Sequence, residues 1–388
     1  MLGVVRFGSS VFRTATVTSI KRLPAWASPR LSTLLTRRRG QCARANPMFD
    51  STGLSRPFIT IAIPTYNRAM LLKECLRSAL AQTYPHFEVL VLDNASTDDT
   101  SKVLRGIQDK KLRVVTQEKN VGLIPNWNSC LAEARGDYVV FVSDDDQIAP
   151  HFLQRCVALI NLEADLPIVV ALSDIFMSQL HRNVAAIPNS KLRTGIWPGK
   201  HILVEFFKRR IHTNICTILL ATREFRARGG FSSEFACATD MAASLPLLLS
   251  DRAGFVNETC GFHSVHDTSA TSGLDLDIRL ADDQKVVDLI ARTVECSKFN
   301  PEERKLLVLE GRRWAARNVI FAIAEIRRRG APLATAMHEI WQWHVHLYCL
   351  GFGDILRLAR PLAIIALPRQ VTASVARVKN AMIGRRLG

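Results

Sequence analysis

Residues 138–150 read YVVFVSDDDQIAP, and the fold class follows from this stretch. The opening YVVFV is β-branched or aromatic without a polar break, which is typical of a strand buried on both faces of a parallel sheet. The strand ends at Asp144, Asp145 and Asp146, whose carboxylates repel one another and are stable together beside a cation. Because ligands of open α/β sheets bind beyond the carboxyl ends of the strands, the triplet indicates a divalent-ion site that bridges phosphate oxygens. The alternative is a solvated acidic loop before a helix that begins near Ala149.

The rest of the chain alternates between strand and helix patterns. Amphipathic spacing predicts helices at 70–80 and 124–134, the second closed by Gly136. Runs of apolar residues predict strands at 58–63, 87–92 and 112–115 before the aspartates, and at 168–172, 216–221 and 253–256 after them. Such alternation builds βαβ units, so we expect an α/β fold with a Rossmann-like, mostly parallel sheet flanked by helices.

Polar residues follow three of the predicted strands. Thr65, Tyr66 and Asn67 follow the first strand, and Asp93 and Asn94 follow the second, while the aspartate triplet follows the strand at 138–142. The carboxyl ends of parallel strands meet at one edge, so one crevice should collect these side chains. The sequence has no GxGxxG or GxxxxGK[ST] loop, which argues against a dinucleotide site or a P-loop. A nucleotide would then be held by carboxylate and amide contacts, with a metal ion neutralising its diphosphate.

The positive charge of the chain is concentrated at its beginning. Residues 1–49 contain nine Lys/Arg and no acid, so most of the net charge of +16 lies there. We expect residues 1–50 to form a disordered basic leader. A mitochondrial transit peptide, which this segment resembles in composition, and a translation start at Met48 are the alternatives.

Composition excludes several other classes of protein. The nine cysteines are scattered without a CxxC pair, which favours a reducing, cytosolic compartment. No apolar run reaches the roughly 18 to 20 residues that a membrane-spanning helix needs. We expect no nucleic-acid partner, because the chain has no recognition motif and no aromatic residues interleaved with Arg and Lys.

Three segments in this order and spacing resemble the nucleotide-sugar half of the family 2 glycosyltransferases. They are ITIAIPTYNR, FEVLVLDNASTDDT and KNVGLIPNWNSCLAEARGDYVVFVSDDDQIAP. The resemblance is close over 57–160 and looser over 160–270, so it implies a GT-A domain at 56–270. It also implies a nucleoside-diphosphate sugar as donor, inversion at the anomeric carbon, and Mn²⁺ or Mg²⁺ as cofactor.

The resemblance assigns a nucleotide-sugar site position by position. Its residues for the base and ribose are Pro64, Thr65, Tyr66, Asn67, Asp93 and Asn94. Many relatives have Asp at position 94, so Asn94 leaves the identity of the base open. Asn128 stands where relatives often have an Asn that faces the nucleotide, whereas the Arg that commonly precedes it is here Trp127.

The same resemblance implies the metal ligands. Counting back from Pro150 makes Asp145 the metal-binding carboxylate and leaves Asp144 beside the ribose. Strand alternation instead puts Asp144 and Asp146 on one side, so all three stay in the predicted site. His266 matches the His of an aromatic-Arg-x-His pattern of the family and is predicted near the diphosphate or metal. A structural histidine is the alternative.

Residues 228–241, RGGFSSEFACATDM, resemble the family stretch that carries the general base. The resemblance implies that Asp240 removes the proton from the acceptor hydroxyl as that oxygen attacks the anomeric carbon. Glu234 is the second choice. Without the resemblance, Asp240 would be interpreted as an acid favoured by a helix N-terminus.

From residue 275 the pattern becomes helical, with helices predicted at 280–290, 302–329 and 334–348. The last forty residues combine apolar positions with seven Lys/Arg against the single acid Asp354. We therefore predict a helical region at 275–388 whose basic amphipathic tail lies on an anionic membrane surface. The alternative is that its apolar faces pack on the catalytic domain and that its arginines are solvated.

Together these patterns predict an inverting, metal-dependent glycosyltransferase in cell-envelope polysaccharide or glycolipid synthesis. Its acceptor would be a glycan or a lipid-linked sugar, and its location the cytoplasm or the inner face of the membrane. A nucleotidyltransferase is a rival, but it would need a Gly-rich, Lys-containing loop after the first strand, where this chain has TYNR. An inactive sugar-nucleotide-binding or membrane-scaffold protein is the other.

Overall fold

The structure, a computed structural model, describes residues 56–177, 182–184, 190–266 and 274–366. These residues belong to one compact unit, Pro47–Gly388. The predicted leader at 1–50 and the part of the basic tail at 367–388 lie outside the described residues.

Strands and helices alternate along the first part of the unit, as predicted. The strands are β1 (Ile59–Thr65), β2 (Phe87–Asp93), β3 (Leu112–Thr116), β4 (Tyr138–Phe141), β5 (Gln147–Ile148), β6 (Ile168–Met177), β7 (Arg182–Val184), β8 (Gly195–Trp197), β9 (Ile218–Ala221) and β10 (Ala253–Val265). The helices up to β10 are α1 (Ala69–Leu80), α2 (Thr100–Arg105), α3 (Leu123–Glu133), α4 (Phe152–Leu162), α5 (Gly199–Phe207), α6 (Thr222–Ala227) and α7 (Thr239–Ser244), with 3₁₀ helices η2 (Ile215–Thr217) and η3 (Leu245–Leu249).

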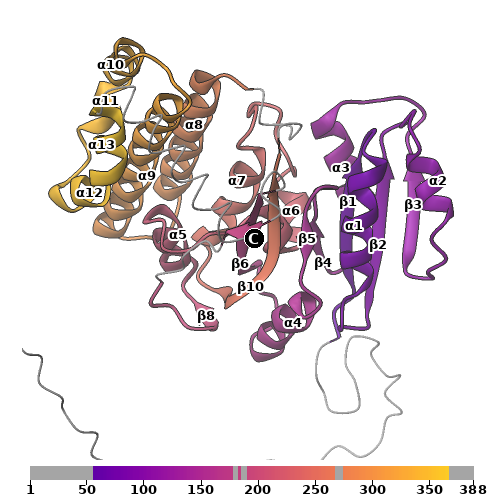
Figure 1. Cartoon of the computed structure of the whole chain (residues 1–388). Helices are drawn as coiled ribbons and strands as arrows, with labels where there is room; N and C mark the ends of the chain where they lie inside the picture. The colour runs from indigo at the N-terminus through magenta and orange to yellow at the C-terminus, as the bar shows by residue number, and fades with distance from the viewer. Residues whose placement is uncertain (1–55, 178–181, 185–189, 267–273, 367–388) are drawn as a thin grey trace, which may run out of the picture. The chain divides into compact units, whose positions relative to one another are not determined.

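One sheet joins the strands in the order β3-β2-β1-β4-β9-β6-β10-β5, with β7 on β6 and β8 on β10 (Figure 1). β1 is parallel to β2 and β4, β2 to β3, and β6 to β10. β9 is antiparallel to both β4 and β6, so it links the two parallel groups. The predicted α/β fold is confirmed, and β4 lies inside the sheet with all its residues buried, as YVVFV indicates.

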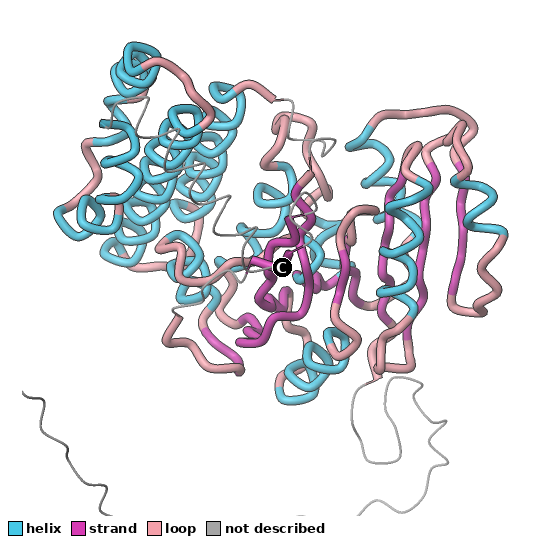
Figure 2. Tube along the Cα trace, viewed as in Figure 1, coloured by secondary structure: helices cyan, strands magenta, loops and turns pink. Residues whose placement is uncertain are grey.

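The sheet has a hydrophobic core on each face, because successive side chains of a strand point to opposite sides. Ile61 and Val140 face one core with α1 and α4, whereas Ala62 and Val139 face the other with α3 and α5. Helices accordingly lie along both sides of the strands (Figure 2). Gly136 allows the chain to enter β4, because a Cβ there would lie 2.5 Å from the backbone nitrogen of Thr60.

Two predicted strands differ from the structure. The stretch 216–221 begins in η2, and only Ile218–Ala221 is a strand. The strand predicted at 253–256 continues to Val265, so His263 lies within β10 instead of after it. The polar residues 257–259 end the apolar run, but the pairing of β10 with β6 resumes beyond two irregularities in its register.

The C-terminal region is helical, as predicted. It consists of α8 (Leu276–Glu295), α9 (Pro301–Arg328), α10 (Leu333–Gln342), α11 (His344–Leu347), α12 (Phe352–Arg357) and α13 (Ala359–Ala366). Val287 on α8 and Trp314 on α9 share a hydrophobic core with Phe207 of α5 and with the sheet. The second half of α8 and the first half of α9 therefore pack on the sheet, and the other halves of both helices form a smaller core with α10 and α13.

The start of the predicted amphipathic tail packs on α9. Leu358 and Ile365 are buried in the smaller core. Arg317 of α9, also buried, pairs with Asp354 of α12 and donates to the backbone oxygen of Phe207. At residues 352–366 apolar side chains are thus packed within the chain, as in the packing alternative, although against the C-terminal helices and not against the sheet. Within the described ranges, no helix is long and apolar enough to cross a bilayer.

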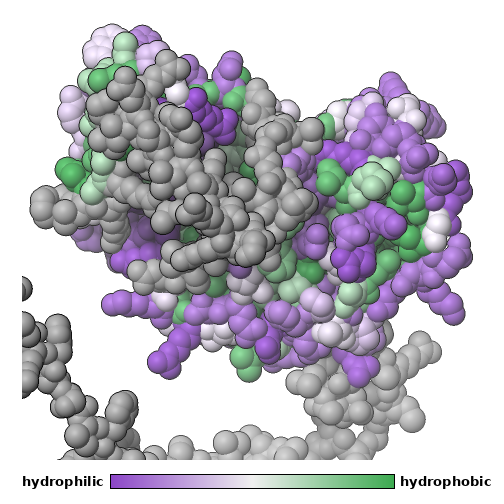
Figure 3. All heavy atoms as spheres, viewed as in Figure 1, coloured by the Kyte–Doolittle hydropathy of each residue, from purple (hydrophilic) through white to green (hydrophobic). Residues whose placement is uncertain are grey.

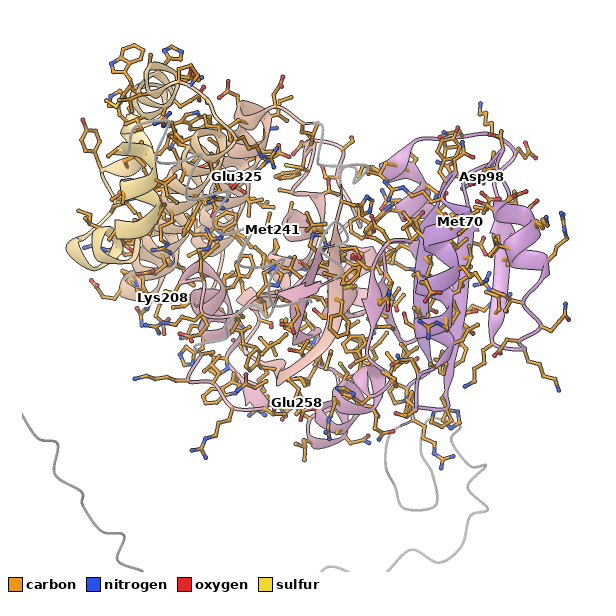
Figure 4. The ribbon with its side chains drawn as sticks, in the orientation of Figure 1. Met70, Asp98, Lys208, Met241, Glu258 and Glu325 are labelled. Atoms are coloured by element: carbon orange, nitrogen blue, oxygen red, sulfur yellow. The ribbon has the colours of Figure 1, made fainter. Side chains whose placement is uncertain are left out.

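Replacing Asp354 with Ala should lower the free energy of unfolding by about 3–5 kcal/mol, because it leaves the buried Arg317 guanidinium without its carboxylate. Urea denaturation would measure the change. The matched control is Glu325→Ala on α9 (Figure 4), whose carboxylate pairs with Arg328 and Arg329 at the surface and should cost about 0–1 kcal/mol. Equal effects would contradict the structural role of Asp354.

Candidate active site

A cavity of about 420 Å³ lies at the carboxyl ends of β1, β2 and β4. The predicted site residues that line it are Pro64, Thr65, Tyr66, Asn94, Asp144, Asp145 and Asp240. Residues of the 120–127 segment, of η2, of the loop before α7 and of β10 complete its walls. The described lining does not include Asn67, Asp93, Asn128, Asp146 or His266.

Arg68 joins two of the three aspartates. Its Nη1 atom donates to Asp144 Oδ1 at 3.2 Å and to Asp145 Oδ2 at 2.9 Å. Thr65 Oγ1 donates to the other oxygen of Asp144 at 2.7 Å. Burial raises the pKa of Asp144 to about 6, with Arg68 opposing and Asp145 reinforcing the shift. The sequence indicated a cation beside these carboxylates, and in the structure a guanidinium from the TYNR turn takes that place.

Asp145 and His266 are also in contact, because the end of β10 runs past the triplet. His266 Nε2 lies 2.9 Å from Asp145 Oδ2. Asp146 points elsewhere and accepts from the Ser264 N–H at 2.9 Å. In the part of the chain that the structure describes, no three His, Cys, Asp or Glu side chains are grouped so that they could hold a metal ion. The predicted set of Asp145, Asp146 and His266 is thus not assembled as one group.

His263 occupies the space between Asp146 and the cavity, which it lines. Its Nδ1 atom lies 3.4 Å from Asp146 Oδ1 and 3.0 Å from Asn214 Nδ2, so its tautomer decides which contact is a hydrogen bond. Burial lowers the pKa of His263, but Asp146, Asp145 and Asp240 together raise it above its ordinary value. Asp146 keeps one buried oxygen, Oδ2, for which the described residues supply no hydrogen-bond partner.

Asn94 shapes the nucleotide side of the cavity. Its Nδ2 atom donates to Asn120 Oδ1 at 2.9 Å and to the Gly122 oxygen at 3.2 Å, and its Oδ1 accepts from the Val121 N–H at 2.9 Å. The end of β2 therefore holds the loop that precedes α3. An Asp at position 94 could not donate to this loop, so the departure from the family pattern has a local structural reason.

Two other predicted residues hold neighbouring turns. Asp93 is buried and accepts from the Ser96 N–H at 3.0 Å. Asn67 adopts a left-handed conformation, φ 53°, which Asn tolerates better than most residues. Its Oδ1 accepts from the Thr97 N–H at 2.7 Å, so it joins the turn after β1 to the turn after β2.

The asparagine of α3 that belongs to the cavity lining is Asn126, not Asn128. Asn128 exchanges hydrogen bonds of 2.9 Å with the backbone N–H and oxygen of Phe231. Asn126 donates to the Leu92 oxygen at 3.2 Å, and its buried Oδ1 lacks a hydrogen-bond partner among the described residues. Asn126 belongs to the cavity lining, whereas Asn128 does not.

Asp240 lies in the first turn of α7, next to Met241 near the middle of Figure 4. Burial raises the pKa of Asp240, and a 2.8 Å hydrogen bond from the Met241 N–H opposes the shift. A carboxylate with a raised pKa suits proton abstraction near neutral pH. Glu234, the second choice, is exposed and does not belong to the described lining.

Asp282 of α8 holds the loop that precedes α7, the helix that contains Asp240. The sequence patterns did not indicate this role of Asp282. Asp282 Oδ2 accepts from the Cys237 N–H at 2.7 Å and from the Ala238 N–H at 3.3 Å, and Lys285 donates to Oδ1 at 3.0 Å. Burial alone would raise the pKa of Asp282, but these hydrogen bonds bring it below its ordinary value. No local pattern connects residues 45 positions apart, so this contact had no signal in the sequence.

The mixed α/β fold, with its mostly parallel central sheet flanked by helices, is similar to the GT-A fold of glycosyltransferases. The crystal structure of S. aureus TarS 1–349 in complex with UDP-GlcNAc is similar to it, with a TM-score of 0.54 over 78% of this chain and 92% of that chain. At 18% sequence identity this likeness shows the fold alone.

Residues 60–217 match the family model of glycosyl transferase family 2. An uncharacterized protein of Mycobacterium tuberculosis is 36% identical over 104 residues, which are 27% of this chain and 33% of that protein. The putative teichuronic acid biosynthesis glycosyltransferase TuaG of Bacillus subtilis is 33% identical over 94 residues, 24% of this chain and 37% of that protein. The matches span about a third of the length of these curated relatives. The predicted family is confirmed.

Replacing Asn126 with Ala should weaken the binding of a nucleoside diphosphate about five- to tenfold, because it removes from the cavity lining a polar side chain whose hydrogen bond to a ligand would be worth about 1 kcal/mol. Isothermal titration calorimetry would measure the affinity. Asn128→Ala is the matched control: it should lower stability through the lost contacts with Phe231 and leave the affinity of the folded protein unchanged. If Asn128→Ala weakened the binding and Asn126→Ala did not, the nucleotide contact would belong to Asn128.

The contribution of Asp282 to stability should depend on pH. Its pKa is lower in the folded chain, so its stabilising effect is complete above the unfolded pKa of about 4 and is lost as the pH falls through the folded value. We expect Asp282→Asn to lower the free energy of unfolding by about 1–3 kcal/mol at pH 7, with a smaller difference at pH 3. Urea denaturation at both pH values measures this. The control Asp288→Asn, at an exposed position of α8, should change the free energy of unfolding little at either pH. If Asp282→Asn lowered the free energy of unfolding equally at both pH values, the role assigned to the Asp282 carboxylate would be wrong.

Proposed function

We propose that this chain transfers a sugar, with inversion, from a nucleoside-diphosphate donor to a hydroxyl acceptor. The observation that carries the proposal is one cavity lined by both Asp145, at the end of β4, and Asp240, in the first turn of α7. Asp145 would act on the donor side of the reaction, and Asp240 would act on the acceptor side. The match to the family 2 model supports the same reaction class.

In the proposed reaction Asp240 accepts the proton of the acceptor hydroxyl while that oxygen bonds to the anomeric carbon. The bond from that carbon to the diphosphate breaks, and the electron pair leaves with the nucleoside diphosphate. No covalent sugar-enzyme intermediate is required. Asp282 contributes indirectly, because it fixes the backbone that presents Asp240.

The residues around Asp145 fit a divalent cation, Mn²⁺ or Mg²⁺. Asp145 Oδ2 is a hard donor atom and His266 Nε2 an intermediate one, and the two atoms lie 2.9 Å apart. The Arg68 guanidinium shows that a positive charge fits between Asp144 and Asp145. We propose that Asp145 and His266 hold the ion. When bound, such an ion stabilises charge on the departing diphosphate as a Lewis acid.

The proposal extends to the pathway, the acceptor and the location. Synthesis of a cell-envelope polysaccharide or glycolipid is supported by the similarity to TuaG, whose name assigns it to teichuronic acid biosynthesis. The acceptor would be a glycan or a lipid-linked sugar, and the enzyme would work at an anionic membrane surface.

Asp240→Asn should lower turnover about 10²–10⁴-fold and leave donor affinity nearly unchanged, because only the proton acceptor is lost. Asp145→Ala should remove metal-dependent binding of the nucleotide. The measurements are nucleoside-diphosphate release from a panel of nucleoside-diphosphate sugars and calorimetric binding of the same compounds. Glu234→Gln, outside the described lining, is the control and should behave like the unmodified chain. Equal loss of binding and turnover in Asp240→Asn would show that Asp240 is structural.

Arg68 should compete with the metal ion for the carboxylates of Asp144 and Asp145, and it should help to bind the diphosphate. It is the single Lys or Arg among the described lining residues, and its guanidinium occupies the carboxylates that the ion needs. Arg68→Ala should therefore bind Mn²⁺ alone about tenfold more tightly and a metal-free nucleoside diphosphate more weakly, both measured by calorimetry.

The control is Arg77→Ala, which removes an exposed charge from α1, the helix that follows Arg68, and should change neither affinity appreciably. Weaker binding of both ligands to Arg68→Ala would mean that Arg68 only maintains the site structure.

A further inference from the structure

One wall of the cavity is apolar and lies at the beginning of α3. This α3 wall consists of Leu123, Ile124 and Trp127, which all belong to the cavity lining. Because Trp127 follows the other two by four and three residues, the three side chains lie on one side of the helix. Leu123 is exposed, whereas Ile124 and Trp127 are partly buried against the core. The wall therefore offers apolar surface in a cavity whose lining also includes three carboxylates.

Aromatic contacts hold Trp127 against the two segments that lead to Asp145 and Asp240. Its ring stacks on that of Phe141 in β4, with 5.7 Å between the centroids and 5° between the planes. The ring of Phe231, which precedes α7, lies 5.0 Å from that of Trp127 at an angle of 87°. β4 leads to Asp145, and the segment after Phe231 leads to Asp240. Trp127 thus packs on both segments that deliver the proposed donor-side and acceptor-side carboxylates.

Among the described lining residues, cations are few and already paired. The lining contains three carboxylates and a single guanidinium, that of Arg68, which pairs with Asp144 and Asp145. His263, the other described lining residue that can carry a positive charge, lies 3.4 Å from Asp146 Oδ1. The diphosphate of a donor adds further negative charge. A carboxylate on the sugar itself would therefore be desolvated beside like charges and without a cation.

We propose that the α3 wall binds the ring of the transferred sugar and that this sugar is a neutral pyranose, not a uronic acid. The transferred sugar is the part of the donor that has to lie between Asp145 and Asp240, and Trp127 packs on the segments of both. The C–H face of a pyranose is apolar, so it can pack on an indole and on aliphatic side chains. This inference rests on the proposed function and names the class of donor that the same site takes.

The test compares matched neutral and anionic donors by calorimetry on the full chain. The probes are the glucose and glucuronate esters, and the galactose and galacturonate esters, of whichever of UDP, GDP, ADP, CDP and TDP binds most tightly. In the tighter-binding pair we expect the neutral ester to bind at least about tenfold better, because the carboxylate of the uronate lacks a cation. Trp127→Ala should weaken the neutral ester about three- to tenfold and leave the free nucleoside diphosphate unchanged. Trp127→Arg should equalise the two esters or reverse their order, because it supplies the missing cation.

The matched control is Trp341→Arg, which adds the same charge at a 71% exposed position of α10, outside the described lining. Figure 3 shows hydrophobic residues at the surface over this helix. The control should keep the preference for the neutral ester. Equal or tighter binding of the uronate esters to the unmodified chain would overturn the proposal. So would an equal loss of the free nucleoside diphosphate in Trp127→Ala, since the indole would then serve the nucleotide and not the sugar. Failure of every nucleoside diphosphate to bind would instead contradict the proposed function on which this inference rests.

Discussion

Three neighbouring carboxylates at the end of a buried strand repel one another, and much of the site is arranged to compensate that repulsion. Asp144 and Asp145 share Arg68 from the turn after β1, and Asp145 also contacts His266. Asp146 accepts from the backbone of Ser264. The partners come from segments that are far apart in the sequence, so the charge of the triplet connects the turn after β1 with the end of β10.

A second set of polar contacts positions the walls of the cavity. Asn94 holds the loop before α3, and Asn128 holds the backbone at Phe231. Asp282 holds the loop before α7 from a helix that the sequence pattern assigned to a separate C-terminal region. Because α8 and α9 also share a hydrophobic core with the sheet, the C-terminal helices belong to the framework that presents Asp240.

The sequence was sufficient for the fold class and for the segments that supply the site, because buried parallel strands and amphipathic helices have strong periodic patterns. The sequence could not show which asparagine of α3 belongs to the cavity lining, since Asn126 and Asn128 both fit the helix pattern. The hydrogen bonds of Asn128 with Phe231, which depend on tertiary packing, decide between them. The role of Asp282 depends on a contact between distant segments, which no local pattern encodes. The tail at 352–366 resembled a membrane helix because burial against α9 and exposure to lipid favour the same amphipathic sequence.

We propose that the edge of the sheet at Asp145 binds the diphosphate of a nucleotide together with a metal ion. The decisive measurement is calorimetric titration of the full chain with UDP, GDP, ADP, CDP and TDP, each with and without Mn²⁺. We expect one of these nucleotides to bind, and Mn²⁺ to strengthen its binding. Absence of binding to all five in a folded protein would mean that this edge of the sheet is not a nucleotide site.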